Sequence, residues 1–200
     1  MDINQVHIDS VKKAFEVKGY RWFPDGRINV FGIRSSKSVP RTFDDIIGCL
    51  WRNSNTTSLD LMLFKGTTVA GLYYLQNPIN VEGTAILVEG QYKNSHVIDL
   101  HKGQYEALCQ RGKMKFYRDN DKDKQFDFNP KTIVEEIIGC NVHRANPNYE
   151  STLVDKWSAA CQVMANPEGF KDFMYLARES EQFNDGKFDY TLLNEKDFVV

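Results

Sequence analysis

Two apolar runs separated by a polar turn cluster are the feature that most restricts the fold of this chain. Residues 43–51 and 59–65 are short and apolar, and residues 52–58 between them are rich in Asn, Ser and Thr. Apolar runs of this length bounded by turn signals are typical of strands, so residues 43–65 predict a β-hairpin. Residues 28–34 and 188–193 show comparable strand patterns. The chain is therefore predicted to be dominated by β-structure.

Two segments instead place apolar residues at helical spacing. They are residues 6–18, which Gly19 ends, and residues 168–177. No internal repeat or low-complexity linker divides the sequence. We predict one mixed α/β, β-dominated domain over residues 1–200, with an N-terminal and a C-terminal helix.

Composition excludes several classes of function. The 200 residues are 42% hydrophobic and 26% charged, with a net charge of −2, which gives no electrostatic case for nucleic acid or an anionic membrane. No apolar run is long enough to span a bilayer, and residues 1–7 do not resemble a signal peptide, so we expect synthesis in the cytoplasm without membrane insertion. The four cysteines lack metal or disulfide-scaffold spacing, which favours free thiols. The oligomeric state is not specified by the sequence.

A histidine and a cysteine supply the most specific chemical pattern. His143 ends a short apolar run, and Cys161 follows eighteen positions later in a turn of small residues, Ser158-Ala159-Ala160-Cys161, that leads towards a helical pattern. A thiol becomes a good nucleophile when a base or a positive field produces the thiolate, and histidine is such a base. Small residues also allow backbone N–H groups to approach a developing oxyanion.

The alternative interpretation is a buried cysteine that acts only as a small apolar residue. Cys49, Cys109 and Cys140 lie in apolar segments, and we predict this structural role for them.

The spacing of the pair resembles a known family. His143, fourteen intervening residues and then Ser158-x-x-Cys161 resemble the signature of the L,D-transpeptidase (YkuD-like) catalytic domain, with the similarity covering about residues 60–165. Residues 67–73 are similar to a strand of that family. The full phrase from 139 to 162 also resembles proteins encoded by bacteriophages and prophages. The chain departs from the family pattern at Ala160, where glycine is usual, and at Val163, where Arg or Asn is usual.

The resemblance implies a YkuD-like β-sandwich and an acyl-transfer enzyme that acts on peptidoglycan stem peptides. Cys161 would attack a peptide carbonyl, His143 would accept the thiol proton, and backbone N–H groups near Ala160 and Cys161 would bind the oxyanion. Ser158 would orient the site or, alternatively, cap the turn.

Further residues are candidates for substrate contact, each with a structural alternative. Arg144 suits a substrate carboxylate or is a surface arginine. Trp157 forms a cleft wall or part of the core, and His101 lines the cleft or is half-buried at a strand end. Ala160 and Gln162 complete the predicted substrate-binding set.

The sequence does not specify which molecule accepts the acyl group. An amine would give a cross-link, whereas water would give a peptidase, as in a phage endolysin released to the cell wall. The departures at Ala160 and Val163 motivate a third hypothesis, a non-catalytic module that binds cell-wall fragments or another protein.

An acidic stretch forms the second motif. Asp119, Asp121, Asp123 and Asp127 occupy positions 1, 3, 5 and 9 of a segment that resembles the first part of an EF-hand loop. Lys124 stands where the loop glycine is expected, and Pro130 where the bidentate glutamate is expected. We predict a polar connecting loop and no cofactor, with a calcium site as the alternative.

Overall fold

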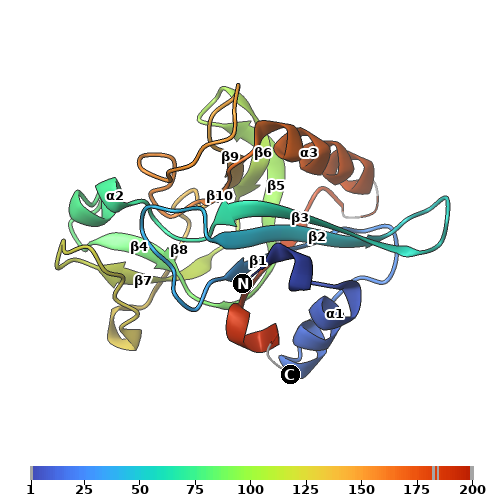
Figure 1. The fold of residues 1–200 in the computed structure, drawn as a ribbon, viewed down its shortest axis with the longest axis horizontal. Helices are drawn as coiled ribbons and strands as arrows, with labels where there is room; N and C mark the ends of the chain where they lie inside the picture. Colours follow the sequence, from blue (N-terminus) through green and yellow to red (C-terminus); the bar gives the residue numbers. More distant parts are fainter. Residues whose placement is uncertain (1, 182, 184, 199–200) are drawn as a thin grey trace.

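The fold is a closed β-barrel with a small sheet beside it. The computed structural model (Figure 1) describes residues 2–181, 183 and 185–198. Its barrel strands follow the order β1-β11-β5-β6-β9-β10-β3-β2. A separate sheet has the order β4-β7-β8. Most neighbouring barrel strands are antiparallel, but β1 pairs with β11 and β9 pairs with β10 in parallel.

The elements have the following bounds. The barrel strands are β1 (Asn29–Arg34), β2 (Asp45–Arg52), β3 (Leu59–Thr67), β5 (Gly90–His101), β6 (Tyr105–Gln110), β9 (Val142–Arg144), β10 (Gln162–Met164) and β11 (Phe188–Asn194). The small sheet contains β4 (Thr84–Leu87), β7 (Met114–Asp119) and β8 (Val134–Glu136). The helices are α1 (Ile8–Val17), α2 (Leu72–Gln76) and α3 (Pro167–Glu181), with short 3-10 turns η1 (Ile3–Gln5), η2 (Pro130–Thr132) and η3 (Glu195–Phe198).

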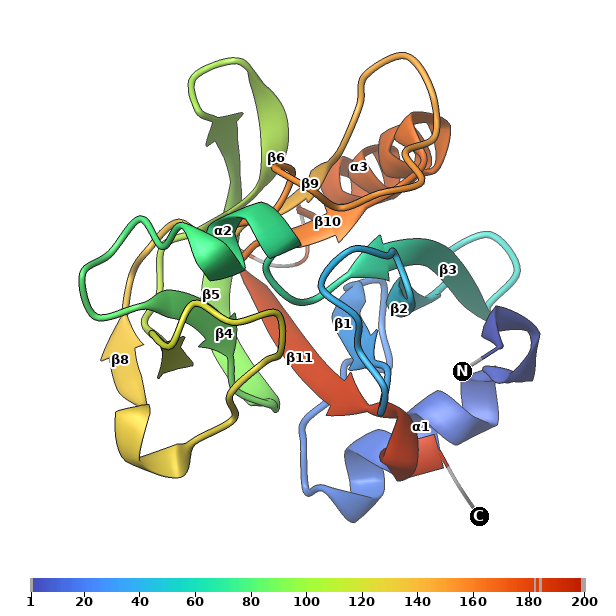
Figure 2. The ribbon, with the colours of Figure 1, turned by 60° about the vertical axis from the view of Figure 1, so that its left-hand side comes forward.

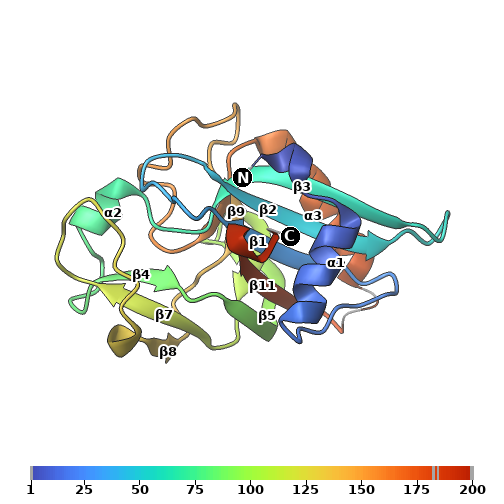
Figure 3. The same cartoon turned by 60° about the horizontal axis from the view of Figure 1, so that its bottom comes forward.

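Helix α1 covers the outside of the barrel. Alternate residues of a strand point to opposite faces, so Phe31 and Ile33 of β1 face outward while Val30 faces the interior. The outward pair packs with Val11 and Phe15 of α1, in a cluster that also contains residues of β2, β3 and β11 (Figure 3). Strand β1 is therefore buried on both faces, which explains why Val30, Phe31 and Ile33 are apolar although they point in opposite directions.

Helix α3 packs on the other side of the barrel and shares its apolar cluster. Phe173, Met174 and Ala177 lie in the same cluster as the inward residues of the strands, and the Phe173 ring meets Phe64 of β3 edge-on. The aromatic stripe of α3 is thus core packing.

The barrel interior also holds a polar network in which each buried group has a partner. The Tyr190 hydroxyl donates to Gln162 Oε1 at 2.6 Å, and Gln162 Nε2 donates to the carbonyl of Ala160 at 3.3 Å. Tyr190 fits because Gly32 lies opposite its hydroxyl, where a Cβ would stand 2.3 Å away. Buried polar groups are costly unless hydrogen-bonded, so this network fixes the relative positions of β1, β10 and β11.

The small sheet lies beside the barrel, with α2 next to it (Figure 2). Ala85 and Leu87 of β4 and Phe116 of β7 belong to the same apolar cluster as the barrel interior, so the two sheets share a core. The segments at the edge of this junction form the pocket described below.

Several predictions from the sequence are confirmed. The hairpin over residues 43–65 forms as β2 and β3 in antiparallel register, and Gly19 follows α1 with a φ of 67°. Helix α3 and strand β11 also form where predicted, so the mixed, β-dominated class is confirmed.

Other predictions are wrong in detail. The sheet closes into a barrel instead of forming a two-sheet sandwich, because β9 and β10 bridge β6 to β3. Residues 67–73 do not form a strand, since β3 ends at Thr67 and α2 begins at Leu72. The turn at Cys161 leads into strand β10, and the helix starts only at Pro167.

Among the described residues, no helix has both the length and the hydropathy that crossing a bilayer requires.

His96 gives a test of the buried polar core. It is fully buried, its Nε2 lies 2.9 Å from the Cys140 carbonyl, and desolvation lowers its pKa from 6.5 to about 4. Between these values the unfolded chain binds a proton that the folded protein does not, so the free energy of unfolding falls as the pH falls. For this one histidine the expected slope is about 1.4 kcal/mol per pH unit below pH 6.5.

The measurement compares wild type with His96→Gln by chemical denaturation from pH 4 to 8. We expect the difference in unfolding free energy between the two to vary below pH 6.5 and to be constant above it. A difference that is constant over the whole range would contradict the assignment. Because the comparison is a difference, it cancels the opposite contribution of Asp44 and Asp119, whose pKa values burial raises to about 6.

Candidate active site

The parallel pairing of β9 and β10 brings together the histidine and the cysteine. Gln162 pairs with Val142 and Val163 pairs with His143, and the Gln162 N–H donates to the Asn141 carbonyl at 2.9 Å. Gln162 and Val142 both point into the barrel and are fully buried. Since side chains alternate along a strand, Cys161 and His143 point to the opposite face. The pair therefore lies on the outer surface of the barrel wall.

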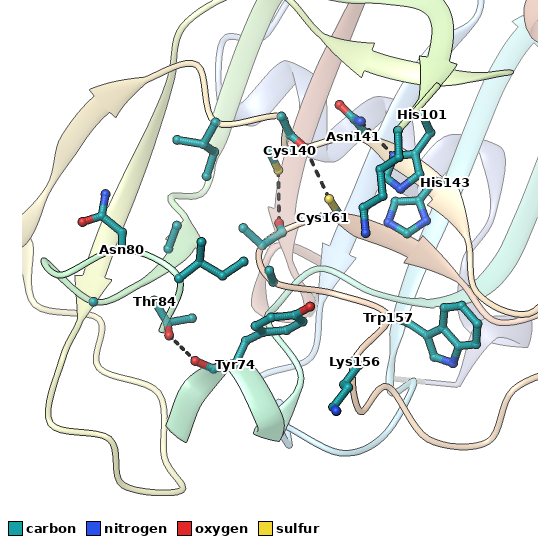
Figure 4. A pocket seen from close by; sticks show the side chains of 18 of the residues that line it. Tyr74, Asn80, Thr84, His101, Cys140, Asn141, His143, Lys156, Trp157 and Cys161 are labelled. Carbon is teal, nitrogen blue, oxygen red and sulfur yellow. Dashed lines mark hydrogen bonds between the residues drawn. The ribbon is translucent and has the colours of Figure 1, made fainter. Parts of the chain in front are cut away.

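A pocket of about 430 Å³ opens over this surface. Its walls come from residues 79–85, 101–102, 138–143 and 156–161, together with Tyr74 and Arg118. The Cys161 sulfur and the His143 ring lie near each other on one wall (Figure 4). The volume is in the range of small-molecule and peptide-segment sites.

His143 is held as a neutral base. Its Nδ1 lies 2.7 Å from the Arg144 carbonyl, which only accepts hydrogen bonds, so Nδ1 carries the proton and Nε2 has a free lone pair. Desolvation, followed by the nearby His101, lowers the pKa of His143 to about 3. The Tyr105 hydroxyl lies 3.3 Å from the same Nδ1 and from the same carbonyl. The imidazole is thus neutral, with its proton on Nδ1, throughout the neutral pH range.

His101 stacks on His143 and has the complementary tautomer. The ring centroids are 4.1 Å apart. The Gln110 N–H donates to Asn141 Oδ1 at 2.9 Å, which fixes the amide, and Asn141 Nδ2 then donates to His101 Nδ1 at 2.9 Å. His101 Nδ1 is therefore an acceptor and its proton lies on Nε2. Desolvation lowers the pKa of His101 to about 4, so both rings are neutral at pH 7.

Cys161 differs from the other cysteines in its exposure. Cys49, Cys109 and Cys140 are buried, whereas Cys161 is partly exposed. Cys140 and Cys161 both line the pocket. The Cys161 thiol donates to the Gly139 carbonyl at 3.4 Å. Desolvation raises the pKa of Cys161 to about 11, although a hydrogen bond from the Asn141 backbone and the charge of Lys102 oppose this rise. The resting pair is therefore a neutral thiol beside a neutral imidazole.

Two backbone donors at the cysteine are free to bind a ligand. Within the described part of the chain, the N–H groups of Ala160 and Cys161 donate to no other residue. Both residues line the pocket. Ser158 supports this turn from behind, since it is buried and its Oγ donates to the Cys161 carbonyl at 2.8 Å. This geometry corresponds to the capping role and places Ser158 outside the pocket wall.

The predicted substrate contacts divide into two groups. Trp157, Ala160 and His101 line the pocket. Gln162 does not, because the strand alternation directs it into the barrel. Arg144 also lies outside the lining, with its guanidinium 4.0 Å from the centre of the Tyr105 ring.

Sequence reasoning missed three residues that build the site. Gln110 is fully buried and makes four side-chain hydrogen bonds: Nε2 donates to the Gly112 and Glu136 carbonyls, and Oε1 accepts from the N–H groups of Ile138 and Cys140. Asn141 orients His101, and Lys102 lines the pocket. The Asn-x-His pattern could have identified Asn141. The roles of Gln110 and Lys102 could not be predicted from a local pattern, because they result from contacts between segments that are distant in the sequence.

The acidic stretch forms a loop after β7. Oxygens of Asp119, Asp121 and Asp127 lie within 4.8 Å of one another, while Asp123 is outside this group and accepts from the Gln125 N–H. Asp119 is buried and its Oδ1 has no hydrogen-bond partner in the described part of the chain. Strand β7 precedes the loop and the 3-10 turn η2 follows it. The loop therefore lacks the two α-helices that flank an EF-hand loop.

Comparison with protein-family models, curated proteins and solved structures finds no match for this chain.

Gln110 gives a test of how the site is built. Gln110→Leu removes four hydrogen bonds and leaves buried backbone groups unpaired, so we expect the free energy of unfolding to fall by about 3 kcal/mol. Chemical denaturation measures this loss. Gln125→Leu, on the exposed acidic loop, is the matched control and should change stability by less than about 0.5 kcal/mol. Equal effects of the two substitutions would contradict the role given to Gln110.

Proposed function

We propose that this protein is a cysteine-dependent acyl-transfer enzyme that acts on peptide bonds of peptidoglycan stem peptides. One observation carries the proposal: a partly exposed thiol, Cys161, lies in a pocket beside an imidazole, His143, whose Nδ1 is anchored on a backbone carbonyl. Anchoring Nδ1 leaves Nε2 as the base.

The reaction proceeds through a thioester. The Cys161 sulfur attacks the carbonyl carbon as the thiol proton passes to His143 Nε2, which forms a tetrahedral intermediate. The free N–H groups of Ala160 and Cys161 stabilise its oxyanion. The C–N bond then breaks, and the leaving amine takes the proton from His143. Because the resting thiol and imidazole are both neutral, proton transfer accompanies the attack instead of preceding it.

His101 supports the base by its position. Its ring covers one face of His143, and its proton on Nε2 makes it a donor in the same pocket.

The peptidoglycan assignment draws on the likeness of the His143–Cys161 spacing to the L,D-transpeptidase signature. A relationship to that family is part of the proposal, and the closed barrel is a difference from the sandwich expected for it. The acceptor decides between two outcomes: an amine gives a cross-link, and water gives a peptidase such as a phage endolysin.

One observation favours a different class of function. Burial raises the pKa of Cys161 to about 11, and the thiol is hydrogen-bonded to a carbonyl, as in an unreactive cysteine. The alternative is a non-catalytic module whose pocket binds cell-wall fragments.

Mass spectrometry of muropeptides separates these functions. Wild type should convert the muropeptides, with a mass gain for a transpeptidase and a mass loss for a peptidase. Cys161→Ala should lower the rate by about 10³-fold or more, because Cys140, the other thiol of the pocket lining, is fully buried and does not replace it. Cys109→Ala, which removes a cysteine outside the pocket, is the control and should retain activity. If folded wild-type protein leaves the muropeptides unchanged, the enzyme proposal is contradicted and the non-catalytic binding module is supported.

The pH dependence of Cys161 alkylation tests the neutral resting pair. The thiolate fraction should rise tenfold per pH unit up to the raised pKa of about 11, so the rate with iodoacetamide should increase steadily from pH 7 to 10. His143→Gln should keep this profile at high pH while reducing turnover of muropeptides by about 10²-fold or more. An inflection below pH 8 that disappears in His143→Gln would instead reveal a thiolate–imidazolium pair.

A further inference from the structure

The charged residues that line the pocket all have one sign. They are Lys102, Arg118 and Lys156, and no described lining residue is Asp or Glu. The chain as a whole carries 27 acidic and 25 basic residues, so a basic wall does not follow from composition. Arg118 is offset by an ion pair with Glu136. Lys102 and Lys156 form no ion pair with a described residue.

A tight turn places Lys102 in the lining of the pocket. It follows His101 in the three-residue turn between β5 and β6, where Lys102 has a φ of 51° and Gly103 a φ of 70°. A left-handed φ is unfavourable for a lysine, so the fold maintains this position at a cost. Lys102 lines the same pocket as Cys161, His101 and His143, and its positive charge lowers the pKa values of all three groups.

Lys156 belongs to a different wall, next to Trp157. Its ammonium lies 4.1 Å from the centre of the Tyr73 ring. A cation–π contact positions the ammonium without neutralising it, because the aromatic ring carries no net charge. Lys102 and Lys156 thus line one pocket from separate segments, with the Lys156 ammonium held over a ring, Tyr73, that lies outside the lining.

We propose that the pocket selects a ligand with a carboxylate group, which Lys102 binds beside Cys161 while Lys156 adds to the attraction from its own wall. This inference rests on the proposed function only in taking that ligand to be the acyl donor. It reassigns the carboxylate contact that the sequence suggested for Arg144, whose guanidinium stacks on Tyr105 outside the pocket lining. A cationic wall without carboxylates also raises the local concentration of anions.

The test uses two alkylating reagents that differ in charge. Iodoacetate carries a carboxylate and iodoacetamide is neutral, and both attach to Cys161 by displacing iodide. The ratio of their rate constants at Cys161 is measured by peptide mass spectrometry at pH 8.5. A change in thiolate fraction affects both reagents equally, so the ratio reports the charge of the pocket alone. The reference is the same ratio for N-acetylcysteine amide, a neutral small thiol.

We expect the ratio for wild type to exceed the reference by about fivefold and to fall in 0.5 M NaCl. Lys102→Gln should lower the ratio by about threefold, Lys156→Gln should lower it less, and Lys102→Arg should preserve it. Lys13→Gln, which removes an exposed charge from α1, is the matched control and should have no effect.

A wild-type ratio equal to the reference, or a ratio unchanged in Lys102→Gln, would overturn the carboxylate site. The assay needs no turnover and therefore separates the two proposals. A high ratio in a protein that does not convert muropeptides would contradict the proposed enzyme activity and support the carboxylate site. A low ratio in a protein that does convert them would support the activity and contradict the carboxylate site.

Discussion

The site depends on the parallel pairing of two strands of only three residues each, β9 and β10. This pairing closes the barrel between β6 and β3 and sets the register in which Val163 lies beside His143. A shift of one residue would turn Cys161 into the interior and Gln162 out to the pocket. The geometry of the proposed nucleophile and base is thus a direct consequence of closing the sheet.

Such short strands need support from outside their own ladder. Gln110 supplies it on one side by holding the N–H groups of Ile138 and Cys140, and the Tyr190–Gln162 contact supplies it inside the barrel. The two thiols Cys140 and Cys161 add a further pair of contacts, each donating to a carbonyl of the opposite segment. Buried polar groups that are fully paired give a unique arrangement, which a purely apolar interior of similar size does not guarantee.

Local patterns predicted the local structure well. The hairpin of β2 and β3, helix α1 and helix α3 each follow from apolar periodicity and turn residues within a few positions of one another. Closure into a barrel was not predictable in this way, because the parallel pairs join segments far apart in the chain. The His143–Cys161 pair was identified from spacing, and the structure places both residues in one pocket. Arg144 and Gln162 lie outside that pocket because the direction of a side chain depends on register, which no local pattern specifies.

The two kinds of residue in the pocket lie on parts of the fold with different constraints. Cys161 and His143 sit on or next to strands whose neighbours are packed on both sides, whereas Lys102 and Lys156 lie in a turn and a loop at the surface. Surface connections tolerate substitution and insertion far better than packed strands do. Ligand preference can consequently diverge among descendants of this protein, or be redesigned in the laboratory, by exchanging those two connections while the barrel wall is inherited unchanged.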